Sequence, residues 1–395
     1  MRRFSRAAVT AAVAAVAAAV VNGTAGWASD TARRPVTGPP PGTQEWRSDR
    51  SPGRALPDPG SASPTEVAAF FADLTETQRQ RLTARHPSVV GNLDGAPVAL
   101  RYRANALALG VPGVPGSGTE SRQILVYDPR GRGRIAEVFG DLARARRVAV
   151  VVPGSDIDAG TFDRTRETAR SLYEAANGPG DGGAARRGRA GGGARSDTGD
   201  DRAEDGPRSD PTGNNPAGNA PTGDEPAGDE PAGTVAVIAW AGYTTPVGVG
   251  LDAATGDLAE DGAERLARFT RGVAATGAAR PALFCHSYGS VVCGLAAERA
   301  GATDIVALGS PGMRADTVAD LRTGARVWAA KAPSDWISRV PNVEFAGLGH
   351  GTDPTAPEFG ARRVPAGDTA GHDGYFAPGT SSLRAFASIA RGEAR

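Results

Sequence analysis

The chain alternates between short runs of apolar residues and longer amphipathic stretches. Residues 147–152 form the clearest run, and Pro153 and Gly154 end it. Similar runs cover residues 123–127, 234–240, 281–285, 304–308, 325–330 and 361–365. Apolar strands separated by helical stretches are typical of a parallel sheet that is covered on both faces. The pattern therefore predicts an α/β fold with a mostly parallel sheet and helices on both sides.

Helical spacing appears before and after these strands. Residues 65–82 carry Val67, Phe70, Phe71 and Leu74 at helical spacing, after a start signal at Ser63 and Pro64. Residues 288–300 and 382–390 are further helical stretches. We interpret residues 64–393 as one domain, in which residues 64–120 form a helical N-terminal extension or cap.

The N-terminus has the pattern of a secretory signal. Three arginines within the first six residues precede an uncharged, mostly Ala and Val run over residues 7–21, and small residues follow. A membrane span needs about 20 apolar residues, and this run has 15. We therefore expect a signal peptide over residues 1–28, cleaved after Ala25 or Ala28, and export to the medium or the cell envelope. A retained N-terminal anchor is the alternative.

Two other segments have a biased composition. Residues 29–63 are rich in Pro, Gly, Ser and Arg, which predicts a disordered tether. Residues 178–233 are first Gly-rich and then form short repeats that begin with proline. Such a segment cannot bury enough apolar surface to offset its ordering entropy. Core-like strands flank it, so we predict a flexible low-complexity insertion within the domain.

Charge and cysteine content exclude several classes of function. Lys+Arg and Asp+Glu both number 44, so the formal net charge is zero. A nucleic-acid-binding surface needs a basic excess, which makes such a partner unexpected. The two cysteines and four histidines do not have metal-ligand spacing. We expect neither a metal nor a cofactor.

A candidate nucleophile lies in the segment Cys285-His286-Ser287-Tyr288-Gly289. A predicted strand leads into this turn and a small-residue helix follows, as a nucleophilic serine at the top of a sheet requires. Cys285 stands where the G-x-S-x-G pattern has glycine, and its small side chain is compatible with the turn. The context predicts Ser287 as the nucleophile, and an ordinary loop serine is the alternative.

A serine nucleophile needs a base and an orienting acid, which follow it in the order acid, then histidine. His350 and His372 are the histidines after the serine. We favour His372, because it lies between the last predicted strand and the C-terminal helix. Asp335 follows the strand at residues 325–330, and Asp353 and Asp373 are its competitors. We predict Asp335 as the acid.

The oxyanion of an acyl-transfer reaction needs backbone N–H donors. The amide of Tyr288, directly after the nucleophile, is one candidate. The other donor should lie in the loop after the strand at residues 147–152. We predict the amide of Ser155 or Gly154 for this role, and a simple turn is the alternative.

Several sequence blocks together resemble one family. They are Gly91–Pro97, Arg101–Asn105, Val152-Pro153-Gly154, Trp240–Tyr243, His286–Ser290, Gly309–Gly312, Asp335-Trp336-Ile337, His350–Pro354 and Gly371–Phe376. In this order they resemble actinobacterial α/β-hydrolases that are catalogued as a domain of unknown function. The resemblance implies the α/β-hydrolase fold and supports Ser287, Asp335 and His372 as a triad. It implies no substrate, and Cys285 departs from the glycine that is frequent in the family.

Cys285 and Cys293 are the two cysteines of the chain. One would end a strand and the other would lie in the helix packed against it. In an exported protein such a pair can oxidise if the Cα atoms lie within about 7 Å. We expect a disulfide between them.

These observations lead to three functional hypotheses. The first is a secreted serine hydrolase, esterase- or lipase-like, that acts on a small-molecule ester or lipid-like substrate. The second is a non-catalytic binding protein on the same scaffold, loosely associated with the cell envelope. The third is an acyltransferase or peptidase that uses the same site. The complete triad favours the first hypothesis over the second.

Overall fold

The structure, a computed structural model, describes residues 34–110, 122–178, 234–248, 250–340, 344–345 and 348–394. The predicted signal peptide at residues 1–28 lies outside the described residues. The predicted insertion lies outside them from residue 179 to residue 233. Among the helices in the described ranges, none combines the length and the apolar character that a membrane span requires.

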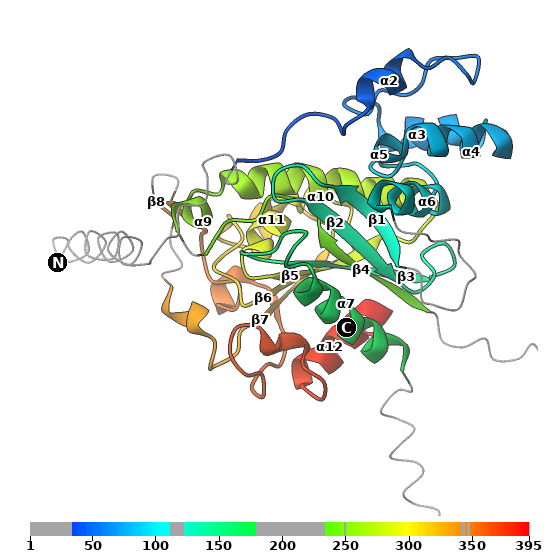
Figure 1. The fold of residues 1–395 in the computed structure, drawn as a ribbon. Coiled ribbons are helices and arrows are strands. Elements are labelled where there is room, and N and C mark those ends of the chain that lie inside the picture. Colours follow the sequence, from blue (N-terminus) through cyan, green and yellow to red (C-terminus); the bar gives the residue numbers. More distant parts are fainter. Residues whose placement is uncertain are drawn as a thin grey trace, which may run out of the picture. The chain divides into compact units, whose positions relative to one another are not determined.

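An eight-stranded sheet forms the centre of the described domain (Figure 1), in the order β1-β2-β4-β3-β5-β6-β7-β10. The strands are β1 (Gln123–Asp128), β2 (Arg134–Phe139), β3 (Arg147–Val152), β4 (Val235–Ala241), β5 (Pro281–His286), β6 (Asp304–Leu308), β7 (Arg326–Ala330) and β10 (Arg362–Arg363). β2 pairs antiparallel with both β1 and β4, and every other neighbouring pair is parallel. The predicted fold class, an α/β fold with a mostly parallel sheet, is confirmed.

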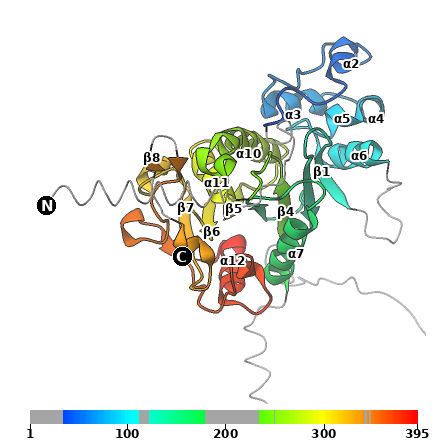
Figure 2. The same ribbon diagram turned by 60° about the vertical axis from the view of Figure 1, so that its left-hand side comes forward.

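Helices cover both faces of this sheet. Successive side chains of a strand point to opposite faces, so one strand can contribute to the buried clusters on both sides. In β3, Val148, Val150 and Val152 belong to one buried cluster, and Ala149 and Val151 belong to another. The first cluster includes residues of α10 (Asp257–Ala275) and α11 (Gly289–Ala296). The second includes residues of α7 (Asp163–Asn177) and α12 (Ser381–Arg391). Figures 1 and 2 show these two helical layers on opposite sides of the strands.

Strand β2 is not anticipated by the apolar pattern, because a carboxylate interrupts it. Glu137 lies in the middle of the strand and is only 3% exposed. Its carboxylate accepts hydrogen bonds from Arg122 and Arg166, at 2.6–3.1 Å. Two guanidinium partners compensate the desolvation of the buried charge, so a charged residue is tolerated inside the sheet.

The N-terminal segment is helical, as expected, but its first helix is divided in two. The helices are α3 (Pro64–Ala72), α4 (Glu76–Arg85), α5 (Pro87–Val90) and α6 (Val98–Leu109). The break falls where Thr75 caps α4 and forms a capping box with Gln78. α3 packs on α10 and α6 packs on β1. The segment therefore extends the domain at the β1 edge of the sheet (Figure 2).

Residues 43–63 correct the prediction of a disordered tether over residues 29–63. They begin with α2 (Thr43–Ser48), whose Trp46 is fully buried. The indole Nε1 of Trp46 donates a hydrogen bond to the carbonyl of Pro57 at 2.7 Å, and the ring contacts His86 edge-on. One large aromatic residue orders this segment, although its overall composition is that of a linker.

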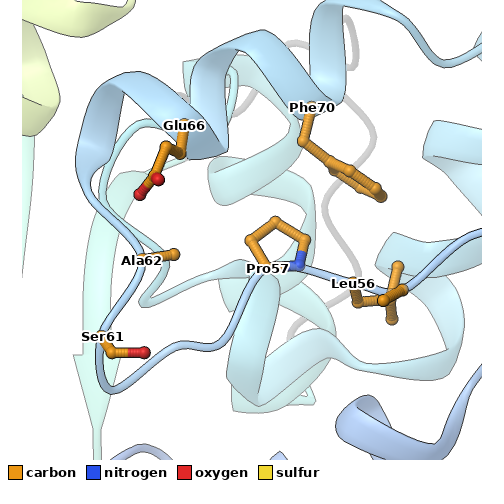
Figure 3. Close-up of a pocket in the computed structure, with 7 residues that line it drawn as sticks. Leu56, Pro57, Ser61, Ala62, Glu66 and Phe70 are labelled. Atoms are coloured by element: carbon orange, nitrogen blue, oxygen red, sulfur yellow. The ribbon is translucent and has the colours of Figure 1, made fainter.

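Short elements complete the described chain. They are α9 (Leu251–Thr255), η2 (Ala319–Leu321), η3 (Trp336–Arg339), β8 (Glu344–Phe345), β9 (Leu348–Gly349), η4 (Pro357–Phe359) and η5 (Gly374–Phe376). Figure 3 shows a pocket beside α3 that is lined by Ala55, Leu56, Pro57, Ser61, Ala62, Glu66 and Phe70. These residues lie between residues 55 and 70 and include none of the predicted catalytic residues.

Candidate active site

Ser287 lies in a sharp turn between β5 and α11. Its φ is 53°, a conformation that is uncommon for residues other than glycine. Its backbone N–H donates to the carbonyl of Leu308, at the end of the adjacent strand β6. A Cβ atom at Gly289 would lie 2.5 Å from the carbonyl oxygen of Val152. The absence of a side chain there lets the helix start directly against β3, and this geometry agrees with the strand–turn–helix setting that the sequence predicts.

A disulfide between Cys285 and Cys293 links the two arms of this turn. Cys285 belongs to β5 and Cys293 to α11, and their Cα atoms are 6.4 Å apart. Both side chains are fully buried. The bridge spans the turn that carries Ser287, and it joins the pair that the sequence analysis expects to be oxidised.

The loop after β3 approaches Ser287 from the neighbouring strand. A Cβ atom at Gly154 would lie 2.7 Å from Cβ and 3.1 Å from Oγ of Ser287. The hydroxyl of Tyr243 donates to the carbonyl of Pro153 at 2.7 Å. The loop therefore holds the Gly154 backbone directly beside the serine hydroxyl.

Further along this loop, hydrogen bonds connect it to the loop after β4. Asp156 has a φ of 64°, and its N–H donates to the carbonyl of Pro246. Its carboxylate accepts the N–H of Gly248 at 2.8 Å. Ser155, a predicted oxyanion donor, is half-buried between these fixed points. Tyr288, the other predicted donor, follows Ser287 directly and starts α11 as its N-cap.

The structure brings Asp335 and His372 together. Nδ1 of His372 lies 2.8 Å from Oδ1 of Asp335, which is 1% exposed and also accepts the N–H of Ile337. The other carboxylate oxygen accepts a hydrogen bond from the hydroxyl of Tyr375 at 2.7 Å. Burial alone would raise the pKa of Asp335, but these three hydrogen bonds outweigh it and hold the pKa below the ordinary value of 3.8. The carboxylate is ionised, so Nδ1 of His372 carries the proton that it donates.

The end of β6 places this pair next to the serine. Leu308 accepts the N–H of Ser287, and Gly309 follows it with a φ of 54°. A Cβ atom at Gly309 would lie 2.9 Å from Oδ2 of Asp335 and 3.1 Å from Cε1 of His372. Two consecutive residues, the last of β6 and the one after it, therefore contact the nucleophile turn and the Asp–His pair.

His286, the residue before the nucleophile, also contacts the candidate base. Its Nε2 lies 2.8 Å from the carbonyl oxygen of His372, so this nitrogen carries a proton and donates it. The centroids of the two imidazole rings lie 4.6 Å apart. Burial and the neighbouring His372 lower the pKa of His286 to about 4, so its ring is neutral near pH 7.

The alternative base and acids have other partners. Nε2 of His350 lies 2.6 Å from the carbonyl oxygen of Ala253, and burial lowers the pKa of His350 to about 4. Asp353 forms an ion pair with Lys331. Asp373 is exposed, and the ring nitrogen that it would have to contact is bound to Asp335. The geometry favours His372 over His350 and Asp335 over both other aspartates.

Two contacting residues, Tyr375 and His286, have no role in the sequence prediction. Both stand within blocks that resemble the family, but their partners lie 40 and 86 residues away along the chain. Ser334 also contacts distant residues without a role in the sequence prediction. Its hydroxyl accepts the N–H of Gly371 and donates to the carbonyl of Thr369. These contacts fix the loop of the base against the loop of the acid.

Comparison with known proteins shows the family of this chain. The family described as "Alpha/beta hydrolase" matches residues 128–191 and 214–345. The chain belongs to the alpha/beta hydrolases. Uncharacterized proteins from two strains of Mycobacterium tuberculosis are 30% identical to this hydrolase over 422 residues. The match covers 85% of this chain and 57% of each relative, so the hydrolase spans little more than half of their length.

A solved structure also matches the hydrolase. It is titled as XC6422 from Xanthomonas campestris, an a/b serine hydrolase without lid. It is 16% identical, covers 71% of this chain and 95% of its own, and has a TM-score of 0.37.

Within the described residues of the hydrolase, no group of three or more His, Cys, Asp or Glu side chains is placed to hold a metal ion.

Proposed function

We propose that this hydrolase cleaves carboxylic esters through an acyl-enzyme on Ser287. One observation carries the proposal: the buried Asp335 and its partner His372 lie against Gly309, whose preceding residue binds the nucleophile turn. A nucleophile, a base and an orienting acid in loops that follow strands of one sheet are the parts that acyl transfer needs.

The first half of the reaction forms the acyl-enzyme. Oγ of Ser287 attacks the ester carbonyl carbon while Nε2 of His372 takes its proton. The amides of Tyr288 and of Ser155 or Gly154 hold the negative charge on the carbonyl oxygen. The imidazolium of His372 is stabilised by Asp335 and then protonates the departing alcohol. The C–O bond to the alcohol breaks, and the acyl group remains on Ser287.

The second half repeats these steps with water. His372 takes a proton from water, the resulting hydroxide attacks the acyl carbon, and Ser287 leaves with a proton from His372. The products are a carboxylic acid and an alcohol, and the enzyme returns to its first state. Neutral His286 leaves the imidazolium of His372 without an adjacent like charge at both stages.

The proposed site of action is outside the cytoplasm. The support is the N-terminal signal pattern together with the buried Cys285–Cys293 disulfide, because structural disulfides persist in oxidising compartments. N-terminal sequencing of protein recovered from the medium or envelope of an expressing bacterium tests it. A new terminus after Ala25 or Ala28 supports export, whereas full-length protein confined to the cytoplasm contradicts it.

A fluorophosphonate probe tests the nucleophile directly, because it reacts with activated serines irrespective of the natural substrate. We expect labelling of the wild type at Ser287 and none in Ser287→Ala. Ser48→Ala is the matched control, since Ser48 is exposed on α2 and its hydroxyl donates to the nearby carbonyl of Glu45. Unlabelled wild-type protein, or equal esterase activity in Ser287→Ala, would refute the proposal.

A further inference from the structure

Trp336 is an exposed aromatic residue next to the candidate base. The residue is 40% exposed, and the centroid of its ring lies 4.7 Å from that of the His372 ring. The other large apolar residues that are exposed among the described ones are Leu107 and Val247. The Asp–Trp–Ile block therefore contributes more to this region than its aspartate.

Local structure keeps this indole at the surface. Asp335 is the N-cap of η3, and it accepts the N–H of Ile337, whose side chain is buried. Within one turn, the residues on both sides of Trp336 point into the protein. The stability of the turn comes from these two neighbours, so it does not explain an exposed tryptophan between them.

The reaction chemistry determines which part of a substrate meets this ring. Asp335 holds Nδ1 of His372, so Nε2 is the atom that delivers a proton to the leaving oxygen. The leaving oxygen must come within hydrogen-bond distance of Nε2. The group attached to that oxygen then lies beside a ring neighbour of His372. On one side this neighbour is His286, which is bonded to the backbone of His372. The other neighbour is the exposed Trp336.

We infer that Trp336 forms the wall of a leaving-group subsite, and that the preferred substrates are esters of aromatic alcohols. This inference rests on the proposed esterase mechanism. An indole face provides a flat apolar surface, on which an aromatic leaving group gains about 0.5–1.5 kcal/mol beyond its area burial. The contact acts only before the alcohol departs. Its effect therefore falls on kcat/KM, which reports acylation, and it leaves the hydrolysis of a shared acyl-enzyme unchanged.

Two acetate esters test this subsite. Phenyl acetate has an aromatic leaving group, and 2,2,2-trifluoroethyl acetate has an activated leaving group without a ring. Both give the same acetyl-enzyme. We expect Trp336→Ala to lower kcat/KM for phenyl acetate about tenfold more than for the trifluoroethyl ester, which corresponds to about 1.4 kcal/mol. Trp336→Phe should retain most of the preference. Leu107→Ala, which removes an exposed apolar residue on α6, should leave the ratio unchanged.

Fluorophosphonate labelling separates failure of this inference from failure of the proposed mechanism. The leaving group of the probe is fluoride, which has no apolar part, so Trp336→Ala should be labelled at the wild-type rate. If the wild type is not labelled, the proposed mechanism fails first. If Trp336→Ala is labelled normally but loses both esters equally, or neither, the leaving-group subsite is refuted. Slower labelling together with an equal loss on both esters would show that Trp336 only positions His372, which also overturns the inference.

Discussion

Removing the hydroxyl of Tyr375 tests how much its hydrogen bonds support Asp335. This hydroxyl accepts the N–H of Ala332 at 2.9 Å and donates to Oδ2 of Asp335 at 2.7 Å. Tyr375 is fully buried, and burial together with the Asp335 contact raises its pKa, so the hydroxyl keeps its proton. Tyr375→Phe retains the ring and removes both hydrogen bonds.

The size of the effect follows from the two partners that are left behind. A buried donor or acceptor that loses its partner costs about 1–3 kcal/mol, and charged groups cost more. We therefore expect Tyr375→Phe to lower the free energy of unfolding by about 2–5 kcal/mol. In a domain of this size this corresponds to a fall in Tm of about 3–8 °C. The activity should fall about tenfold, because Asp335 stays in place but is less firmly oriented. Asp335→Asn should lose about 10⁴-fold, because the tautomer of His372 is no longer fixed.

The same variant should change the response to acid. The folded-state pKa of Asp335 lies below its ordinary value of 3.8, so its contribution to stability is present above that value. That contribution is lost as the pH falls through the folded-state pKa. Tyr375→Phe removes one of the hydrogen bonds that lower this pKa. As the pH is lowered, the variant should therefore begin to lose stability at a higher pH than the wild type does.

Urea unfolding at several pH values, together with kcat for an ester, measures these effects. Tyr173→Phe is the matched control, because the Tyr173 ring packs on Phe139 near the start of β4, whereas the candidate site follows the carboxyl ends of the strands. It should leave both stability and rate close to wild type. If Tyr375→Phe unfolds at the wild-type urea concentration and turns over at the wild-type rate, the hydroxyl does not support Asp335.

Two further predictions concern the nucleophile turn. Replacing Cys285 and Cys293 by alanine opens a covalent loop with a sequence separation of 8, which should lower the free energy of unfolding by about 2.5 kcal/mol in the chain-entropy account. Urea midpoints with and without reductant check this, and equal midpoints for the oxidised wild type and the double variant would contradict it. His286→Ala removes the donor to the His372 carbonyl and should lower kcat about tenfold with little change in KM, whereas His286→Gln keeps a donor and should recover most of the rate. If steady-state kinetics gives His286→Gln the same kcat as His286→Ala, the hydrogen bond does not position the base.

Much of the fold follows from local patterns in the sequence, and the exceptions have physical causes. The apolar run of β3 can be recognised directly, since all but its first residue is buried. Strand β2 escapes recognition because Glu137 interrupts it, and the two arginines that make Glu137 acceptable come from other elements. The segment around Trp46 looks like a linker because a single buried indole has little weight in a composition argument.

The residues of the candidate active site also fall into those that the sequence predicts and those that it does not. Ser287, Asp335 and His372 can be selected from chain order and from the elements that precede and follow them. Chain order cannot reveal Tyr375 or His286, because the reason for each residue type is a partner on a distant loop. Both residues stand in blocks that resemble the family, but the sequence does not show which distant residue each one contacts. Trp336 is a further case, since its exposure depends on the burial of both of its neighbours.

The end of β6 illustrates a third kind of information, which lies in the backbone alone. Leu308 and Gly309 contribute no reactive side chain, yet one binds the N–H of Ser287 and the other contacts both Asp335 and His372. A side chain at Gly309 would have to displace the acid or the base, in addition to adopting a positive φ. The end of one strand therefore contacts both the turn of the candidate nucleophile and the candidate acid and base. The same principle applies at Gly154, where the absence of a Cβ lets the backbone reach the serine hydroxyl. At both positions a glycine lets the backbone come close to a residue of the candidate site, Ser287 at Gly154 and the Asp335–His372 pair at Gly309.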